Sequence, residues 1–351
     1  MESVEPLAVP SRSAIRKAGD ILRSREPSPK EYLEAISLLS HWRSLYSYPI
    51  NTFQAYLRAK IKRNKYSSAI VAQRLKRMPS IVNKLQRFPS MQLDRMQDIG
   101  GLRVVLKNIS EVFELHESIL GSKRFEHTPE MPPRDYIKIP KDDGYRSLHQ
   151  VFKYANKKHP ELNGLRIELQ IRTLLQHSWA TAVETLGIVE KSSFKTGEGG
   201  EQFKRFFKVS SALFSMDEGT SVLAELKNES REQLIQELNE IENALQVSSK
   251  LKGLTISAKH IEQTSLHFAG YHLMELDIEK GRISLIPFLE KQLDSAEDLY
   301  RAREQATRDN PNISVVLISA GNVKDIKKAY PNYFLDTNGF LKNLNRICGK
   351  Q

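Results

Sequence analysis

The segment RIELQIRT, at residues 166–173, is the sequence feature that most constrains the fold. In an extended strand, successive side chains point to opposite faces. Glu168, Gln170 and Arg172 therefore share one face, and the isoleucines and leucine between them share the other. The apolar face belongs in a protein core, so the polar face lines a surface or a cleft. The segment predicts a half-buried sheet with an acid and a base on its open face.

Patterns elsewhere predict an α/β (α+β) fold, in which a mixed sheet is flanked by helices. Apolar spacing before residue 50 predicts helices, one of them starting at Ser28, and Pro79 suits the first turn of a further helix. We expect Ser295 and Asp298 to cap a later helix and Gly187 to end another. Proline, aspartate and glycine predict a loop at 128–147. Expected strands are 67–77, 101–108, 149–155, 166–173, 271–278, 283–290 and 313–320; expected helices are 51–66, 109–120, 174–187, 201–250, 295–309 and 322–330.

The polar segment EKSSFKTGEGG, at residues 190–200, indicates a domain boundary. After it, the sequence is first helical and acidic and then returns to an α/β pattern. We therefore expect a first domain at 1–195, a helical connector at 196–255 and a small C-terminal α/β domain at 256–351.

Cysteine and hydropathy patterns exclude several classes of protein. Cys348 is the only cysteine, which excludes an internal disulfide and a zinc cluster of thiolates. No stretch approaches the ~18 consecutive apolar residues that a membrane span requires. The first residues lack the apolar core of a signal peptide, so we expect a cytoplasmic protein.

Positive charge is concentrated in one part of the chain. The net charge is +11, and no acidic residue occurs between Glu34 and Asp94. Cations without carboxylates between them repel one another unless a polyanion lies nearby, and triphosphate, RNA or both would serve. The alternative is a solvated basic surface. The eleven cations are Arg43, Arg58, Lys60, Lys62, Arg63, Lys65, Arg74, Lys76, Arg77, Lys84 and Arg87.

Two acids remote in the chain are candidate metal ligands. Asp98 lies just before the strand GLRVVLKN, and Gly100 and Gly101 permit a turn between it and Arg103. If this strand neighbours RIELQIRT, Asp98 and Glu168 can share a divalent cation. Two carboxylates together with phosphate oxygens suit Mg²⁺. Either acid taken alone is more often a solvated surface group.

A triphosphate cradle is predicted beside these acids. Lys76, Ser80 and Lys84 are spaced by four residues, and Arg87 adds a further helical step. Backbone N–H groups at the helix start near Ser80 favour an anion. Arg74 can stack on a base or clamp a phosphate. The cradle is not a Walker loop, since GxxxxGK[ST] occurs nowhere in the chain.

Four motifs together resemble the synthetase domain of RelA/SpoT homologues over roughly residues 50–187. They are RLKRMPSIVNKLQR, DIGGLR, RDYIKIPKDDGYRSLH and ELQIRT. The resemblance implies a nucleotidyltransferase-like fold and transfer of the β,γ-pyrophosphate of ATP to a nucleotide 3′-hydroxyl, with AMP released. It implies that Asp98 and Glu168 bind Mg²⁺ and that Arg103 joins them in catalysis. It further implies an ATP site of Arg74, Lys76, Ser80, Lys84, Arg87 and Arg103, and an acceptor site of Tyr145, His149 and Gln170, with Tyr145 stacked on the base.

One departure concerns the acceptor. Many members of this family read Asn-Gly-Tyr where this chain has Asp143-Gly144-Tyr145. The extra negative charge disfavours a free guanine nucleotide. The acceptor therefore stays open between GDP or GTP, which would make the chain a (p)ppGpp synthetase, and the 3′ CCA end of tRNA.

The C-terminal region favours the tRNA end. Its Tyr330-Pro331-Asn332-Tyr333 sequence, after a synthetase, resembles the plan of CapRel-type fused toxin–antitoxin proteins. That resemblance implies a small pseudo-zinc-finger-like regulatory domain that blocks a translation-inhibiting toxin through Tyr330 and Tyr333. It also implies a role in anti-phage defence, with release by a phage structural protein. We expect tRNA phosphates to contact cations outside the ATP motif, namely Arg58, Lys60, Lys62, Arg63 and Lys65. The remaining alternative is an inactive RNA-binding or sensor module.

Overall fold

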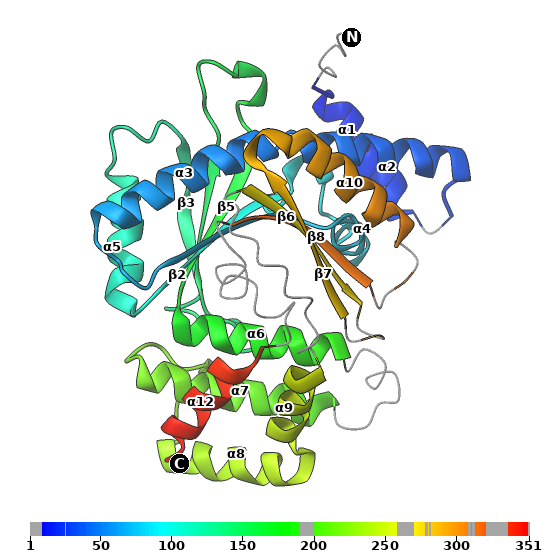
Figure 1. The fold of residues 1–351 in the computed structure, drawn as a ribbon. Coiled ribbons are helices and arrows are strands. Elements are labelled where there is room, and N and C mark those ends of the chain that lie inside the picture. Colours follow the sequence, from blue (N-terminus) through cyan, green and yellow to red (C-terminus); the bar gives the residue numbers. More distant parts are fainter. Residues whose placement is uncertain are drawn as a thin grey trace.

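The computed structural model contains two β-sheets and a cluster of helices, which agrees with the predicted mixed fold class (Figure 1). The structure describes residues 9–24, 26–189, 200–257, 270–277, 280, 282–307, 310, 313–320 and 336–349. Within these ranges, no helix is both long and apolar enough to cross a membrane. The predicted helix at 322–330, together with Tyr330 and Tyr333, lies outside them.

The larger sheet has five strands in the order β1-β2-β5-β4-β3. Its central pair, β2 and β5, runs parallel, and every other neighbouring pair runs antiparallel. The segment RIELQIRT thus lies at the middle of the sheet, where it has a partner on each side. The strands are β1 (Ile70–Leu75), β2 (Gly100–Leu106), β3 (Thr128–Asp135), β4 (Leu148–Lys153) and β5 (Arg166–Thr173).

The prediction of a loop throughout 128–147 is wrong at its start, because β3 forms there despite three prolines. Proline cannot donate to a strand ladder, so it is tolerated in edge strands. β3 is an edge strand, and its register to β4 shifts between Glu130 and Arg134. The chain from 136 to 147 is a loop, as predicted.

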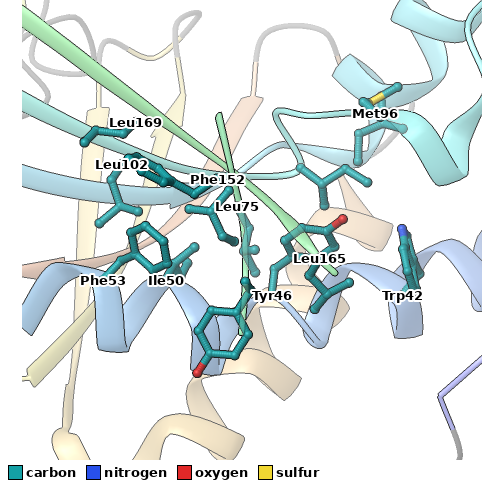
Figure 2. Close-up of a cluster of buried hydrophobic side chains, with 14 of the residues drawn as sticks. Trp42, Tyr46, Ile50, Phe53, Leu75, Met96, Leu102, Phe152, Leu165 and Leu169 are labelled. Atoms are coloured by element: carbon teal, nitrogen blue, oxygen red, sulfur yellow. The ribbon is translucent and has the colours of Figure 1, made fainter. Parts of the chain in front are cut away.

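The apolar face of this sheet packs against α3 and its neighbours (Figure 2). Phe53 of α3 is fully buried in one cluster with Leu102 of β2 and Leu169 of β5. Gly100 begins β2 and forms no turn, contrary to the prediction; a Cβ there would lie 2.7 Å from the Tyr46 ring. Gly100 therefore permits close packing of helix and strand. The helices that contribute to this core are α1 (Arg12–Arg23), α2 (Pro29–Ser44), α3 (Ser47–Arg63), α4 (Met78–Arg87) and α5 (Ile109–Leu120).

A second core is built by helices that follow β5. The first of them, α6, continues two residues past Gly187, where the sequence predicted its end. Phe340 near the C-terminus contacts Phe206 and Phe214, so the last helix packs among the connector helices. The helices of this second core are α6 (Leu174–Val189), α7 (Gly200–Asp217), α8 (Arg231–Leu245), α9 (Val247–Ser257) and α12 (Asn338–Ile347).

The smaller sheet, in the order β7-β6-β8, docks with its helix α10 on the N-terminal part of the chain (Figure 1). β8 packs along β1, and Glu304 of α10 forms a 2.7 Å ion pair with Arg43 of α2. The predicted helix forms, but it begins before Ser295 with Gln292 at its N-cap, so the predicted cap is wrong. The elements are β6 (Gly270–Asp277), β7 (Arg282–Leu289), α10 (Leu293–Ala306) and β8 (Ile313–Ala320).

Candidate active site

The polar face of the larger sheet carries five of the predicted site residues. Arg74 of β1 and Glu168 of β5 flank the same glycine of β2 in register. Two residues further along β2 and β5, Arg103 lies beside Gln170. Gln170 in turn lies beside His149 of β4. Side chains two residues apart on a strand share a face. The pairing of β2 with β5 is therefore what joins the DIGGLR and ELQIRT motifs into one site.

Asp98 and Glu168 line the same pocket, together with Arg74, Arg103 and Gln170. Asp98 lies just before β2, at the end of that strand where Glu168 is found on β5. The two carboxylates are close enough for the charge of Glu168 to act on the pKa of Asp98. Two acids seventy residues apart are thus brought into one small, strongly charged space.

Asp98 is held between two ammonium groups. Its carboxylate oxygens accept hydrogen bonds from Lys76 at 2.8 Å and from Lys84 at 2.9 Å. Burial opposes ionisation, but the two lysines outweigh it and keep the pKa of Asp98 below its ordinary value. Burial also lowers the pKa of Lys76, although Asp98 counteracts this. The side of the pocket predicted to bind ATP, the pyrophosphate donor, therefore combines a carboxylate with two ammonium groups. It is called the donor side below.

Helix α4 carries the other residues that were predicted to bind ATP. Ser80, Lys84 and Arg87 share a face by helical spacing, and of these Lys84 reaches Asp98. Arg87 is exposed, with its guanidinium 5.4 Å from the centre of the Phe88 ring. The predicted anion site at the helix start is changed, because the backbone N–H of Met78 donates to Glu304 of α10 at 2.9 Å.

On the side predicted to bind the pyrophosphate acceptor, called the acceptor side below, three side chains are linked by hydrogen bonds. The Tyr145 hydroxyl lies 2.9 Å from Nε2 of His149, and Nδ1 of His149 lies 3.1 Å from Glu168. Gln170 donates to the other oxygen of Glu168 at 2.8 Å. The motif GYRSLH thus connects the tyrosine of a loop to the carboxylate of the central strand.

The protonation states in this chain follow from Glu168. Burial opposes its ionisation, but His149 and Gln170 outweigh the burial and lower the pKa of Glu168 to about 2. An ionised carboxylate only accepts hydrogen bonds. Nδ1 of His149 must therefore carry a proton, and in the neutral ring Nε2 accepts from the Tyr145 hydroxyl.

The structure adds groups that lie within the motifs but to which no role was assigned from the sequence. The Lys141 ammonium lies 4.5 Å from the centre of the Tyr136 ring and 5.0 Å from that of Tyr145. Arg172, which the strand pattern placed on the polar face, is almost fully buried and bonds His177 of α6. Burial, reinforced by the charge of Arg103, lowers the pKa of Arg172 to about 9. The sequence signal for the Lys141 contacts was a loop that contains both aromatic and basic residues. No such signal existed for the burial of Arg172, which depends on contact with α6.

The predicted tRNA-binding cations lie elsewhere. They belong to the end of α3 and the turn after it, and α3 covers the apolar face of the sheet, opposite the pocket. Lys60 is buried and donates to the Ser118 carbonyl at 2.6 Å, so its assignment as an RNA contact is wrong. Its ammonium fixes α3 to α5. The other four, Arg58, Lys62, Arg63 and Lys65, are exposed.

The residues of the pocket fit a divalent cation. Asp98 and Glu168 both have lowered pKa values, so both are ionised at neutral pH. The lysine ammoniums at 2.8 and 2.9 Å show that positive charge can reach both oxygens of Asp98. Mg²⁺ in phosphate-transfer sites takes one or two carboxylates together with phosphate oxygens and water. The carboxylates of Asp98 and Glu168 agree with that pattern.

Comparison with known proteins covers the same part of the chain. Residues 73–198 match the model of the "Region found in RelA / SpoT proteins". The similarity to RelA/SpoT proteins thus lies in the middle of the chain. The RelA/SpoT match contains every residue that lines the pocket except Ala72.

Individual relatives agree with this match. The GTP pyrophosphokinase YjbM of Bacillus subtilis is 34% identical over 118 residues, which are 33% of this chain and 54% of the relative. A GTP pyrophosphokinase of Escherichia coli K12 is 28% identical over 171 residues, 48% of this chain and 21% of the relative. The chain thus spans about half or less of the length of these relatives. The solved structure of small alarmone synthetase 1 from Bacillus subtilis, bound to its product pppGpp, is 27% identical; the match covers 50% of this chain and 90% of that one, with a TM-score of 0.43.

Proposed function

We propose that the chain is an ATP-dependent pyrophosphokinase of the RelA/SpoT type, which transfers the β,γ-pyrophosphate of ATP to a 3′-hydroxyl. The observation that carries the proposal is that Asp98 and Glu168 line one pocket with Arg74 and Arg103. Transfer of phosphoryl groups requires mainly positioning and neutralisation of charge. Two carboxylates for a cation and several fixed cations for phosphates supply both.

In the proposed reaction the 3′-oxygen of the acceptor forms a bond to the β-phosphorus of ATP. The bond between that phosphorus and the oxygen bridging to the α-phosphate breaks, and AMP leaves with the bonding electrons. Arg74, Lys76, Lys84 and Arg103 bind ATP, with Ser80 and Arg87 on the same face of α4. Glu168, ionised and facing the acceptor side, accepts a hydrogen bond from the attacking hydroxyl and orients it. The hydroxyl proton is released to solvent as the new bond forms.

Asp98 and Glu168 would hold Mg²⁺. When bound, the ion would supply neutralisation of charge on the transferred pyrophosphate. Lys76 and Lys84, which pair with Asp98, would bind phosphate oxygens of ATP. Tyr145 supplies an aromatic face for the acceptor base, worth about 1–3 kcal/mol per stacked base.

A guanine nucleotide is the acceptor that the relatives compared above favour, since both are named GTP pyrophosphokinases. Asp143 weakens the sequence argument against it. Its carboxylate accepts from the backbone N–H of Tyr145 at 2.9 Å, within its own turn. Asparagine would make the same bond with its carbonyl oxygen. Asp143 therefore stabilises the turn before Tyr145. We propose that the reaction is (p)ppGpp synthesis.

The tRNA CCA end is the second candidate, and its support is the net charge of +11 with four exposed cations at the end of α3 and in the turn after it. Since those cations lie across the sheet from the pocket, an RNA would have to pass around the sheet edge. Binding to tRNA should then weaken steeply across a salt series. A flat salt response contradicts this candidate.

Label transfer tests the proposal. Purified protein is incubated with ATP labelled at the γ-phosphorus, Mg²⁺ and either GDP, GTP or tRNA. Label in a guanine nucleotide supports (p)ppGpp synthesis, and label at the 3′ end of tRNA supports the toxin. Absence of transfer to all three, with ATP bound, contradicts the assignment as a pyrophosphokinase.

We further propose that the C-terminal domain restrains a growth-inhibiting enzyme. The support is the contact of α10 with the start of α4, where Glu304 accepts from Met78. If the domain restrains the enzyme, Tyr330→Ala or Tyr333→Ala should make expression more toxic. Unchanged growth with these variants, while residues 1–257 alone inhibit growth, contradicts a latch at the tyrosines. A phage structural protein that relieves the restraint remains part of this proposal.

A further inference from the structure

The loop that carries Tyr145 is packed against α7, a helix outside the RelA/SpoT match. Gly144 has a φ of +92°, which glycine adopts without strain. A Cβ at this position would lie 3.1 Å from side-chain atoms of both Ser211 and Trp179. The Ser211 hydroxyl also donates to the Gly144 carbonyl at 2.6 Å. The turn before Tyr145 is therefore shaped by its contact with α6 and α7.

Arg146, the residue after Tyr145, turns away from the pocket and into this interface. It is 2% exposed, and its guanidinium donates to Glu218 at 2.8 Å, to Thr220 at 3.2 Å and to Ser211 at 3.3 Å. A buried arginine requires such partners, since an unpaired buried charge is strongly destabilising. The Tyr145 loop is thus fixed at the residues on both sides of the tyrosine.

Glu218 joins the loop to the central strand. Besides Arg146, its carboxylate accepts hydrogen bonds from Thr173, the last residue of β5, and from Gln176 of α6 at 3.1 Å. Its side chain is only 9% exposed. One carboxylate after the end of α7 therefore ties the acceptor loop to the strand that carries Glu168.

We propose that Glu218 is a positioning residue for the acceptor: through Arg146 it fixes the loop that holds Tyr145 against His149. The inference rests on the proposed function, since it assigns the acceptor half of that site. Glu218 lies outside residues 73–198. The acceptor geometry is accordingly set by the connector helices as well as by the synthetase sheet.

The inference predicts a split between the two substrates. In Glu218→Gln, the KM for the acceptor should rise roughly 10- to 100-fold, the size of effect that a small misplacement in an active site produces. The KM for ATP should change little, because the donor residues contact other elements. Backbone amides at 141–147 should also exchange hydrogen faster, and this readout requires no activity.

Asp217→Asn is the matched control. Asp217 precedes Glu218 but pairs with Arg346 of α12 at 2.7 Å, and Arg346 is largely exposed. This variant should exchange and turn over like the wild type. If Glu218→Gln does not fold, the double variant Glu218→Gln/Arg146→Gln removes both buried charges and should show the same loosened loop.

The outcomes separate this inference from the proposed function. Faster exchange at 141–147 with a raised acceptor KM supports it. Wild-type exchange and an unchanged acceptor KM overturn it. Faster exchange in a protein whose wild type transfers no pyrophosphate supports positioning of the loop and contradicts the proposed reaction. An equal rise in both KM values shows general damage and overturns the positioning role.

Discussion

The donor and acceptor halves of the candidate active site are built differently. The donor half, with Lys76, Lys84 and Asp98, consists of partly exposed charges just after β1, on α4 and just before β2. The acceptor half, with Tyr145 and His149, is an aromatic and hydrogen-bonded unit that helices cover. Charge neutralises phosphate without exact geometry, whereas stacking and a hydrogen-bonded chain depend on orientation. The donor half can therefore be local, while the acceptor half requires a supporting wall.

The C-terminal region contacts both halves by different means. Glu304 of α10 accepts a hydrogen bond from the Met78 amide at the start of α4, and it also pairs with Arg43 of α2. α12 packs against α7, one of the two helices that support the Tyr145 loop, with Phe340 against Phe207. A movement of this region could thus act on either substrate, and the variants below distinguish the halves.

Removal of the charge on Asp98 should have the largest effect. Asp98→Asn deprives two lysines of their partner and the cation of a ligand, so kcat should fall about 10²- to 10³-fold, as when one preorganised electrostatic contact is lost. Steady-state label transfer measures this. Asp94→Asn, whose carboxylate pairs with Arg16 instead, is the control. Full activity of Asp98→Asn would remove the donor half from the mechanism.

Truncation of Tyr145 should affect the acceptor half only. Tyr145→Ala loses a stacking face worth about 1–3 kcal/mol, and kcat/KM for the acceptor should fall roughly 5- to 150-fold. Tyr145→Phe keeps the face but loses the bond to His149, so a smaller decrease is expected. ATP binding, measured by calorimetry, should not change. A parallel loss of ATP affinity would show that the two halves are not separable.

Neutralisation of Glu304 should affect the donor half modestly. Glu304→Gln weakens its contacts with Arg43 and the α4 amide, and the free energy of unfolding should fall by roughly 1–3 kcal/mol. Less negative charge at the start of α4 should lower the KM for ATP up to about fivefold. Thermal melts and ATP titrations measure both. Asp298→Asn, in an exposed pair on the same helix, should match the wild type. A weaker affinity for ATP would mean that α10 supports the donor helix and does not restrain it.

Acid should reveal the contribution of Glu168 to stability. The pKa of Glu168 is about 2 in the folded chain, below its ordinary 4.5. Its contribution to stability is therefore present above about pH 4.5 and is lost as the pH falls toward 2. Glu168→Gln should lose less stability than the wild type between those values, as measured by urea midpoints. Equal losses would show that His149 does not stabilise the ionised form.

The sequence by itself determined the local elements and the residue types of the site. Alternation fixed β5 and its polar face, and helical spacing placed Ser80 and Lys84 on one face of α4. Both inferences succeed because strand and helix periods depend only on the backbone. The apolar pattern could not show that Lys60 would be buried against α5, since that depends on which helices meet.

Only the tertiary structure decided how the site is supported. The parallel pairing of β2 with β5 joined Asp98 to Glu168, and α7 supplied Glu218 to the acceptor loop from outside the motifs. The prediction of a free helix start at α4 was wrong, because Glu304, 226 residues away, accepts its first hydrogen bond. Contacts between distant segments leave no periodic trace in the sequence; they depend on which surfaces fit when the elements pack.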